Sequence, residues 1–184
     1  IVSSSVPEMR MITSVGHALL CKAGLSLEEE ALAAGEQPLG ACVVTGAGAL
    51  PARRVLHAVS TWSEASCIAR ATSRALLAAE EEHLRTLAIP ALGTGTARVT
   101  LESAAYAEAS ALRFHLVLGG SRLREVRFVL MGEEKLRAFR EVLFDVLLQD
   151  GEGRGDHGLH HVAGPSDVVS YDAPTFVTPS VFRR

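Results

Sequence analysis

The alternation of two apolar patterns constrains the fold of this chain more than any other feature of its sequence. Short runs of β-branched and apolar residues predict strands over residues 39–45, 53–60, 86–90 and 126–131, and Ile1-Val2 predicts the end of another strand. Apolar residues that recur at three- and four-residue steps predict helices over residues 15–24, 26–34, 63–84, 100–118 and 133–147. Because strands and helices alternate, we predict a three-layer α/β/α sandwich with a mostly parallel, mixed sheet.

Residues with strong capping preferences mark two of the predicted helix starts. Ser26 is placed to cap the second helix, with Glu28 in the first turn, where the positive end of the helix dipole favours an acid. Thr100 is placed to cap the fourth helix, with Glu102 in its first turn. Gly35 follows the second helix and predicts its end.

The sequence divides into a folded domain and a different C-terminal segment. The chain has 184 residues, of which 48% are hydrophobic, and this is enough for one sizeable core. We predict a domain over residues 1–149 and a flexible linker or C-terminal tail over residues 150–184, because the latter is rich in glycine and holds three prolines. The chain begins on Ile1 without an initiator methionine, so we expect it to be part of a larger protein.

Net charge and cysteine content exclude several classes of function. The net charge is −3, and the most basic stretch, residues 122–127, is interrupted by acidic and apolar residues. We interpret that stretch as ordinary solvated surface and expect no nucleic-acid partner. No apolar run is long enough to cross a membrane, so no membrane partner is expected. Cys21, Cys42 and Cys67 are widely spaced and show no metal-binding pattern, which favours a cytoplasmic location and predicts no metal site.

The segment Gly93-Thr94-Gly95-Thr96 is the strongest candidate for a functional site. It follows a predicted strand and precedes a predicted helix, and ligands of open α/β sheets bind at the carboxyl ends of strands. Glycines let a ligand approach the backbone closely, and successive N–H groups near a helix N-terminus bind phosphate oxygens. The hydroxyls of both threonines would add donors. The sequence therefore predicts a phosphate-binding loop.

Established phosphate-binding motifs do not fit this loop. A Walker loop needs Gly-Lys-Ser/Thr, whereas Gly95 is followed by Thr96-Ala97. A dinucleotide-binding fingerprint needs a third glycine, and Arg98 stands at that position. A tight strand–helix turn without any ligand therefore remains an alternative interpretation.

Six stretches, in order along the chain, carry a resemblance to a known family. They are residues 15–24, residues 40–45 with Leu50, residues 55–59 with Trp62, residues 89–95, Glu102 with residues 104–105, and residues 126–130. Together they extend over about residues 1 to 148. On these stretches the chain resembles a macro domain, the ADP-ribose-binding module. The resemblance implies a three-layer α/β/α fold, in agreement with the pattern of strands and helices.

The resemblance also implies which residues hold the ligand. In macro domains one loop surrounds the pyrophosphate and the distal ribose, and the residues from Gly93 to Ala97 match that loop. A first loop lies before the short helix, where Val15 and Gly16 would supply backbone contacts. Apart from the resemblance, the position of Arg98 directly after the second loop leaves two interpretations open: a bidentate pair with a phosphate, or a solvated surface arginine. No cofactor is implied.

Several positions depart from the family pattern. The family's Asn-Ala-Ala-Asn motif falls on Ser3-Ser4-Ser5-Val6, so both asparagines are replaced. A later glycine falls on Arg98, and the strand that carries the adenine-recognising aspartate would precede Ile1. In hydrolytic members an asparagine of the first loop orders the reacting water, which Val6 cannot do. We therefore expect binding without efficient catalysis and predict no catalytic residue.

Three hypotheses on function follow. The first is binding of ADP-ribose or a related nucleotide diphosphate, either free or attached to an ADP-ribosylated protein. The second is ADP-ribosyl hydrolysis by a rearranged first loop, with a water oriented by Ser3 or Ser5. The third is a scaffold for protein interaction that has lost its ligand. His57 lies between apolar neighbours in a predicted strand, so we interpret it as a hydrogen-bonded core histidine.

Overall fold

The computed structural model describes residues 1–61, 64–95, 97–148, 159–162 and 168–172. The strands are β1 (Val2–Ser5), β2 (Cys42–Thr45), β3 (Val55–Val59), β4 (Thr86–Pro90), β5 (Glu125–Val129), β6 (Leu159–Val162) and β7 (Val168–Asp172). The helices are α1 (Ser14–Ala23), α2 (Ser26–Ala33), α3 (Ala65–Glu81), α4 (Leu101–Leu118) and α5 (Glu133–Leu148). The predicted alternation of strands and helices is confirmed, and the order of these elements agrees with an α/β fold.

The strands form two hydrogen-bonded groups whose inner edges meet. In the first group β3 lies between β1, which is parallel to it, and β2, which is antiparallel. In the second group the order is β4-β5-β7-β6, with only β4 and β5 parallel. β1 contacts β4, and Ile1, which directly precedes β1, lines a cavity together with the first residues of β4. The two strands therefore begin at one edge of the molecule and end at the other.

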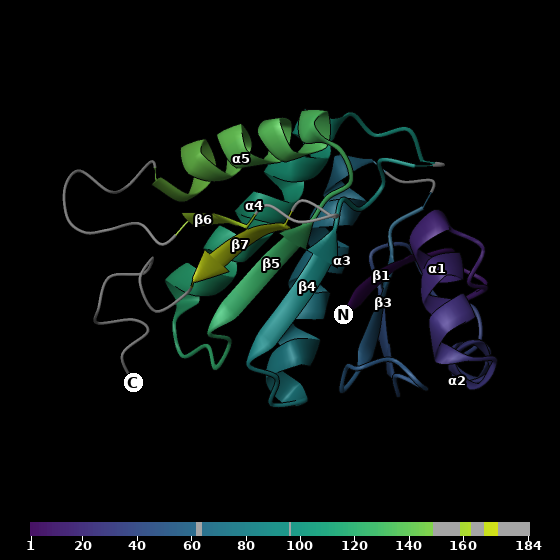
Figure 1. The fold of residues 1–184 in the computed structure, drawn as a ribbon. Coiled ribbons are helices and arrows are strands. Elements are labelled where there is room, and N and C mark those ends of the chain that lie inside the picture. The colour runs from purple at the N-terminus through teal and green to yellow at the C-terminus, as the bar shows by residue number, and fades with distance from the viewer. Residues whose placement is uncertain (62–63, 96, 149–158, 163–167, 173–184) are drawn as a thin grey trace.

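Helices cover the strands in two sets. α1 contacts β1, α2 contacts β2, and α3 contacts β2 and β3, while α4 packs against both α3 and α5. Figure 1 shows α1 and α2 beside β1 and β3, and α3 and α4 behind β4 and β5. This is the predicted sandwich with a mixed sheet.

The main core lies between α3, α4, α5 and the strands β3, β4 and β5. Phe128 of β5 and Phe139 of α5 are both fully buried, with ring centroids 6.1 Å apart in a tilted arrangement. Each buried side chain of this size contributes about 1.5–3 kcal/mol by leaving water. The facing side of α4 is rich in alanine, which lets α3 approach closely.

The start of α2 differs from the sequence prediction. Ser26 is the first helical residue and not the N-cap, and Leu25 at the cap position has no side-chain acceptor. The first turn is instead closed by backbone carbonyls: Leu27 donates to Gly24, and Glu28 donates to Leu25. Because Gly24, the C-cap of α1, directly precedes Leu25, backbone groups of the connection close the first turn of α2 without a side-chain hydroxyl.

The strand predicted over residues 39–45 is shorter and less buried than expected. β2 begins at Cys42, and three of its four residues are only half-buried. Gly40 lies in a turn with a φ of +84°, and Ala41 donates to Pro38 across it. β2 is an outer strand of its group, so one of its edges pairs with no other strand among the described residues. Cys42, interpreted as a buried core thiol, is half-buried for the same reason.

Two strands lie in the segment predicted to be a linker or tail. β6 and β7 pair with one another, and β7 pairs antiparallel with β5 over five residues from Val168 to Asp172. The proposed end of the domain near Gln149 stays a prediction. Among the described residues, no helix combines the length and apolar character that a membrane crossing requires.

Candidate functional site

The predicted phosphate loop connects the carboxyl end of β4 to the N-terminus of α4. It leaves the strand at Pro90, and Leu92 and Gly93 are buried while Gly95 is exposed. Val99 donates to the carbonyl of Gly93 at 3.1 Å, and Arg98 donates to that of Gly95 at 3.1 Å. These two bonds fold the loop back on itself before the helix begins.

Two features of the backbone favour glycine at position 93. Its φ is +72°, a conformation that costs other residues about 1–2 kcal/mol. A Cβ atom here would also lie 2.5 Å from Cδ1 of Ile68, which is fully buried in the core. Gly95 differs, because no described atom lies within 4 Å of the position of its Cβ. The loop therefore turns inward at the first glycine and presents the second to solvent.

The other predicted residues of the loop have different surroundings. The hydroxyl of Thr94 donates to the carbonyl of Ala91 at 3.0 Å, so it holds the turn and does not point to solvent. Thr96 lies outside the described residues, and Ala97 is half-buried. Arg98 is exposed and has a φ of +54°. Arg98 thus has the backbone conformation that favours glycine, at the position where the family resemblance places one.

The helix after the loop begins as predicted. Thr100 is the N-cap of α4, and its Oγ1 accepts from the N–H of Ser103 at 3.2 Å. Glu102 lies in the first turn. The prediction of this cap is confirmed. The positive end of the α4 dipole therefore lies five residues beyond Gly95, and it favours an anion near the loop.

Glu108 supports the loop from the core side, and the sequence reading missed it. Its side chain is fully buried, and Oε1 accepts from the N–H of Leu92 at 2.7 Å. Oε2 has no hydrogen-bond partner among the described residues. Burial raises the pKa of this carboxyl well above its ordinary value, against the opposing effect of the Leu92 N–H. The helical spacing could have indicated this burial, because Glu108 lies on the same apolar face of α4 as Ala104, Ala105 and Leu112.

The first loop lies at the carboxyl end of β1. Thr13 caps α1: its Oγ1 accepts from the N–H of Gly16 at 3.0 Å and donates to the carbonyl of Ser4 at 2.7 Å. A Cβ on Gly16 would lie 2.8 Å from the same hydroxyl oxygen, so packing accounts for this glycine. Val15 is half-buried in the first turn. The backbone N–H of Gly16 is thus already occupied by the cap.

Two of the three serines at the position of the family's first-loop motif, Ser3 and Ser5, are buried. Ser3 and Ser5 are buried in β1, and Oγ of Ser5 is 3.4 Å from Nδ1 of His57. Nε2 of the same ring is 2.9 Å from Oγ1 of Thr45. The interpretation of His57 as a hydrogen-bonded core histidine is confirmed. Burial lowers its pKa to about 4, so the imidazole is neutral at neutral pH.

Comparison with known proteins agrees with this architecture. A family model described as "Macro domain" matches residues 5–107. An uncharacterized protein of Pyrobaculum aerophilum is 36% identical over 135 residues, which are 70% of this chain and 74% of that protein. A macro domain-containing protein of Caldanaerobacter subterraneus subsp. tengcongensis is 34% identical over 108 residues, which are 55% of this chain and 61% of that protein.

Solved macrodomain structures share the fold at low sequence identity. The Oceanobacillus iheyensis macrodomain with ADP has a TM-score of 0.73 at 20% identity, covering 80% of this chain and 84% of that one. The Trypanosoma brucei macrodomain in complex with ADP-ribose has a TM-score of 0.69 at 22% identity, covering 76% of this chain and 62% of that one. Since the family model matches more than half of the residues, this chain belongs to the macro domain family.

Proposed function

We propose that this chain binds ADP-ribose or a related nucleotide diphosphate, with its phosphates held by the loop from Gly93 to Ala97. Macrodomains of the same fold have been solved with ADP and with ADP-ribose, which supports this class of ligand. The observation that carries the proposal is the loop geometry at the carboxyl end of β4. Gly93 turns the chain inward at a φ of +72°, and Gly95 faces open space.

Backbone groups supply most of the proposed contacts. The N–H groups of the loop and the positive end of α4 attract phosphate oxygens without any charged side chain. Arg98 is exposed directly after the loop, where its guanidinium would pair with a phosphate. Val15 and Gly16 would contact the ligand from the first loop. The N–H of Gly16 donates to Oγ1 of Thr13, so it would have to be shared between that hydroxyl and the ligand. An ADP-ribosylated protein would present the same phosphates and is the partner we propose.

Binding without hydrolysis is favoured over catalysis by the burial of the first-loop serines. Orienting a water on a bound ligand requires a hydroxyl that faces the ligand. Ser5 is buried and directed to His57, and Ser3 is fully buried within β1. Neither residue is therefore placed as the hydrolase hypothesis requires. The scaffold hypothesis makes a different prediction, since it expects no ligand response at all.

A thermal-shift titration with ADP-ribose, AMP and inorganic pyrophosphate tests the proposal. Ligand at about 100 times its dissociation constant adds roughly 2.7 kcal/mol to the free energy of unfolding, which raises Tm by roughly 5–10 °C in a domain of this size. Gly95→Glu should abolish the rise with ADP-ribose, because it places a carboxylate where the phosphates would bind.

The matched control is Ala33→Glu on the exposed face of α2, which makes the same change in charge away from the loop. This variant should keep the full ligand response. A Tm that does not respond to ADP-ribose in a cooperatively folded wild-type sample would refute the proposal and support the scaffold hypothesis.

A further inference from the structure

The Gly93 loop contains backbone N–H groups that donate to no acceptor within the described part of the chain. They belong to Gly93, Thr94, Gly95 and Ala97. The N–H groups on either side of this segment are engaged. Those of Arg98 and Val99 donate to carbonyls of the loop, and that of Leu92 donates to Glu108. The loop thus holds its free donors between two ends that are fixed by hydrogen bonds.

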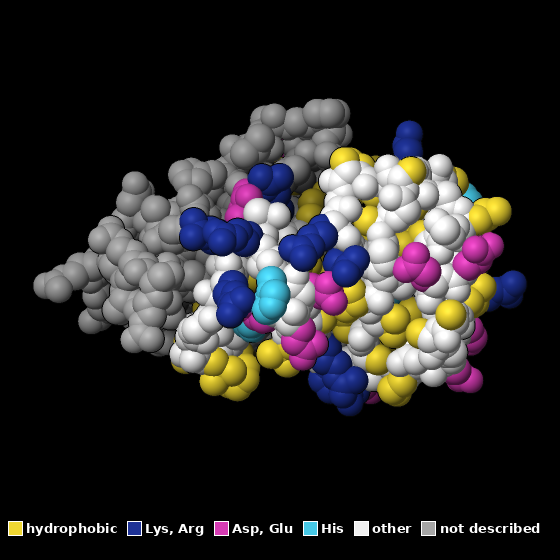
Figure 2. Space-filling view, turned by 90° about the horizontal axis from the view of Figure 1, so that it is seen from below, with side chains coloured by type: hydrophobic (Ala, Val, Ile, Leu, Met, Phe, Trp, Pro, Cys, Tyr) yellow, Lys and Arg dark blue, Asp and Glu magenta, His cyan; other side chains and the backbone are white. Residues whose placement is uncertain are grey.

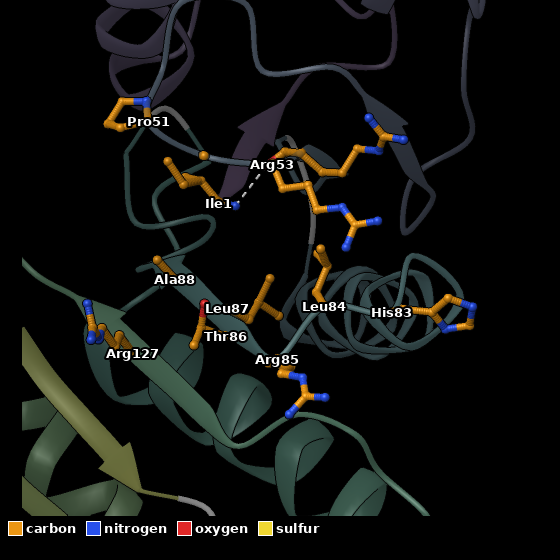
Figure 3. Close-up of a pocket in the computed structure, with 12 residues that line it drawn as sticks. Ile1, Pro51, Arg53, His83, Leu84, Arg85, Thr86, Leu87, Ala88 and Arg127 are labelled. Atoms are coloured by element: carbon orange, nitrogen blue, oxygen red, sulfur yellow. Dashed lines mark hydrogen bonds between the residues drawn. The ribbon is translucent and has the colours of Figure 1, made fainter.

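Several positively charged side chains gather at the other edge of the molecule. Figure 2 shows Lys and Arg side chains on the face seen from below, which is the edge where β4 begins in Figure 1. Figure 3 shows Arg85 and Arg127 beside the first residues of β4, whereas the Gly93 loop follows Pro90 at the far end of that strand. Attraction of an anion to the loop therefore depends mainly on backbone N–H groups and on the α4 dipole, and both act along fixed directions.

Glu108 fixes the direction of the peptide group that enters this segment. Its Oε1 accepts from the N–H of Leu92 at 2.7 Å, and both residues are fully buried. The next residue, Gly93, is confined on the core side, because a Cβ atom there would lie 2.5 Å from Cδ1 of Ile68. Leu92 lies beyond the end of β4 at Pro90, so its N–H is held by a side chain and not by the sheet.

One helix holds both ends of the loop. α4 begins at Leu101, with Thr100 as its N-cap, and it carries Glu108 deeper within the same helix. The hydrogen bond from Leu92 therefore ties the start of the loop to the helix that follows its end. A shift of Leu92 relative to α4 would change the directions of the free N–H groups between them.

Packing alone does not require an acid at position 108. The other buried residues of α4 are alanines and leucines, and Oε2 of Glu108 has no partner among the described residues. A buried polar atom without a partner destabilises the folded state, and an apolar side chain would avoid that effect. Burial raises the pKa of this carboxyl well above its ordinary value, which favours the neutral form. A neutral carboxyl accepts from Leu92 and adds no negative charge behind a loop that would hold phosphates.

We propose that Glu108 is a positioning residue of the ligand site, which directs the free N–H groups of the Gly93 loop toward a bound diphosphate without contacting it. This inference rests on the function proposed above. It assigns the effect to the hydrogen-bond acceptor at position 108. Glutamine would supply the same acceptor, whereas methionine, of similar length, would leave the N–H of Leu92 without one.

Two measurements on one set of variants test the proposal. Amide hydrogen exchange, followed by NMR without ligand, reports on the N–H of Leu92, and isothermal titration with ADP-ribose reports the affinity. In Glu108→Met this N–H should exchange about tenfold faster and Kd should rise about tenfold, since the loss of one hydrogen bond changes an equilibrium by about that factor. Glu108→Ala also lacks the acceptor, so it should have the same effect, and it replaces Glu108→Met if that variant does not fold.

Two further variants separate the acceptor from a general effect of repacking. Glu108→Gln should keep most of the wild-type affinity and the slow exchange of Leu92. Leu112→Met is the matched control, because it places a methionine on the same buried face in the next turn of α4, farther from the loop. It should leave both measurements unchanged. Urea unfolding shows whether each variant is folded under the conditions of the assay.

Three results would overturn the proposal. The first is unchanged exchange of the Leu92 N–H in both Glu108→Met and Glu108→Ala. The second is an equal loss of affinity in Glu108→Gln and Glu108→Met, because the acceptor would then have no role. The third is the same loss in Leu112→Met, which would show a general effect of repacking.

Failure of the proposed function gives a different result. A wild-type chain that does not bind ADP-ribose would refute that function and, with it, the role of Glu108 in affinity, even if exchange at Leu92 becomes faster in Glu108→Met. A wild type that binds ADP-ribose, with unchanged affinity in Glu108→Met, would refute the role of Glu108 alone.

Discussion

Replacing Glu108 by glutamine should change how the stability of this protein depends on pH. Glu108 is fully buried, and burial raises the pKa of its carboxyl well above the ordinary value of 4.5. The folded protein therefore holds a proton that the unfolded chain releases above pH 4.5. The contribution of the protonated Glu108 carboxyl to the free energy of unfolding is complete below pH 4.5. It is lost as the pH rises toward the pKa that Glu108 has in the folded protein. In this window the free energy of unfolding should fall by about 1.4 kcal/mol per pH unit.

His57 has the opposite effect in part of the same window. Burial lowers its pKa from 6.5 to about 4, so the unfolded chain binds the extra proton as pH falls. Its contribution is complete above pH 6.5 and is lost between 6.5 and 4, which amounts to about 3 kcal/mol. The two slopes nearly cancel between pH 4.5 and 6.5. Of these two groups, Glu108 alone continues to act above pH 6.5, and the difference between wild type and variant isolates its effect.

Urea unfolding of the wild type and Glu108→Gln from pH 5 to 8 measures this difference. Glutamine keeps an oxygen that accepts from the N–H of Leu92 but has no proton to release. The stability of the variant relative to the wild type should therefore rise by about 1.4 kcal/mol per pH unit until the folded pKa of Glu108 is reached. Glu102→Gln, an exposed change on the same helix, is the control and should give a small, flat difference. Parallel pH profiles for the wild type and Glu108→Gln would refute the reasoning.

Three further changes test the geometry of the two loops, each by urea unfolding of the purified chain. Gly93→Ala should destabilise by about 2–4 kcal/mol, because it adds left-handed strain to a collision with Ile68; a loss below about 0.5 kcal/mol would mean that the turn relaxes easily. Arg98→Gly should stabilise the protein by up to about 1 kcal/mol, because glycine relieves the strain at a φ of +54°, and the extra backbone entropy of glycine in the unfolded chain offsets only part of this gain. A clear loss of stability would contradict this. Thr13→Ala should cost about 1–2 kcal/mol by removing the cap of α1 and the bond to Ser4, whereas Thr13→Ser should retain most of it; equal effects of the two substitutions would show that the hydroxyl is not the cause.

Local patterns in the sequence were sufficient to predict most elements of this fold. The bounds of β4 and the cap of α4 at Thr100 follow from residues that are adjacent in the chain, because strand alternation and capping are local effects. The same locality explains the prediction of the Gly93 loop, since a glycine pair between a strand and a helix is visible in four residues. The prediction that Ser26 is the N-cap of α2 was wrong, because the backbone carbonyls of Gly24 and Leu25, just after the end of α1, accept the hydrogen bonds of the first turn.

Only the tertiary structure decided which charged residues are buried and which lie next to one another. Residues 122–127 read as ordinary surface, yet Arg127 lines a cavity together with Arg53 and Arg85, which come from segments more than 30 residues away along the chain. Glu108 was not singled out from the sequence, yet its side chain is fully buried and accepts a hydrogen bond from the N–H of Leu92. Periodicity along a chain reports which face of an element is apolar. It does not report which groups from distant elements share one low-dielectric space, and that sharing sets the pKa of a buried acid and the potential within a cavity.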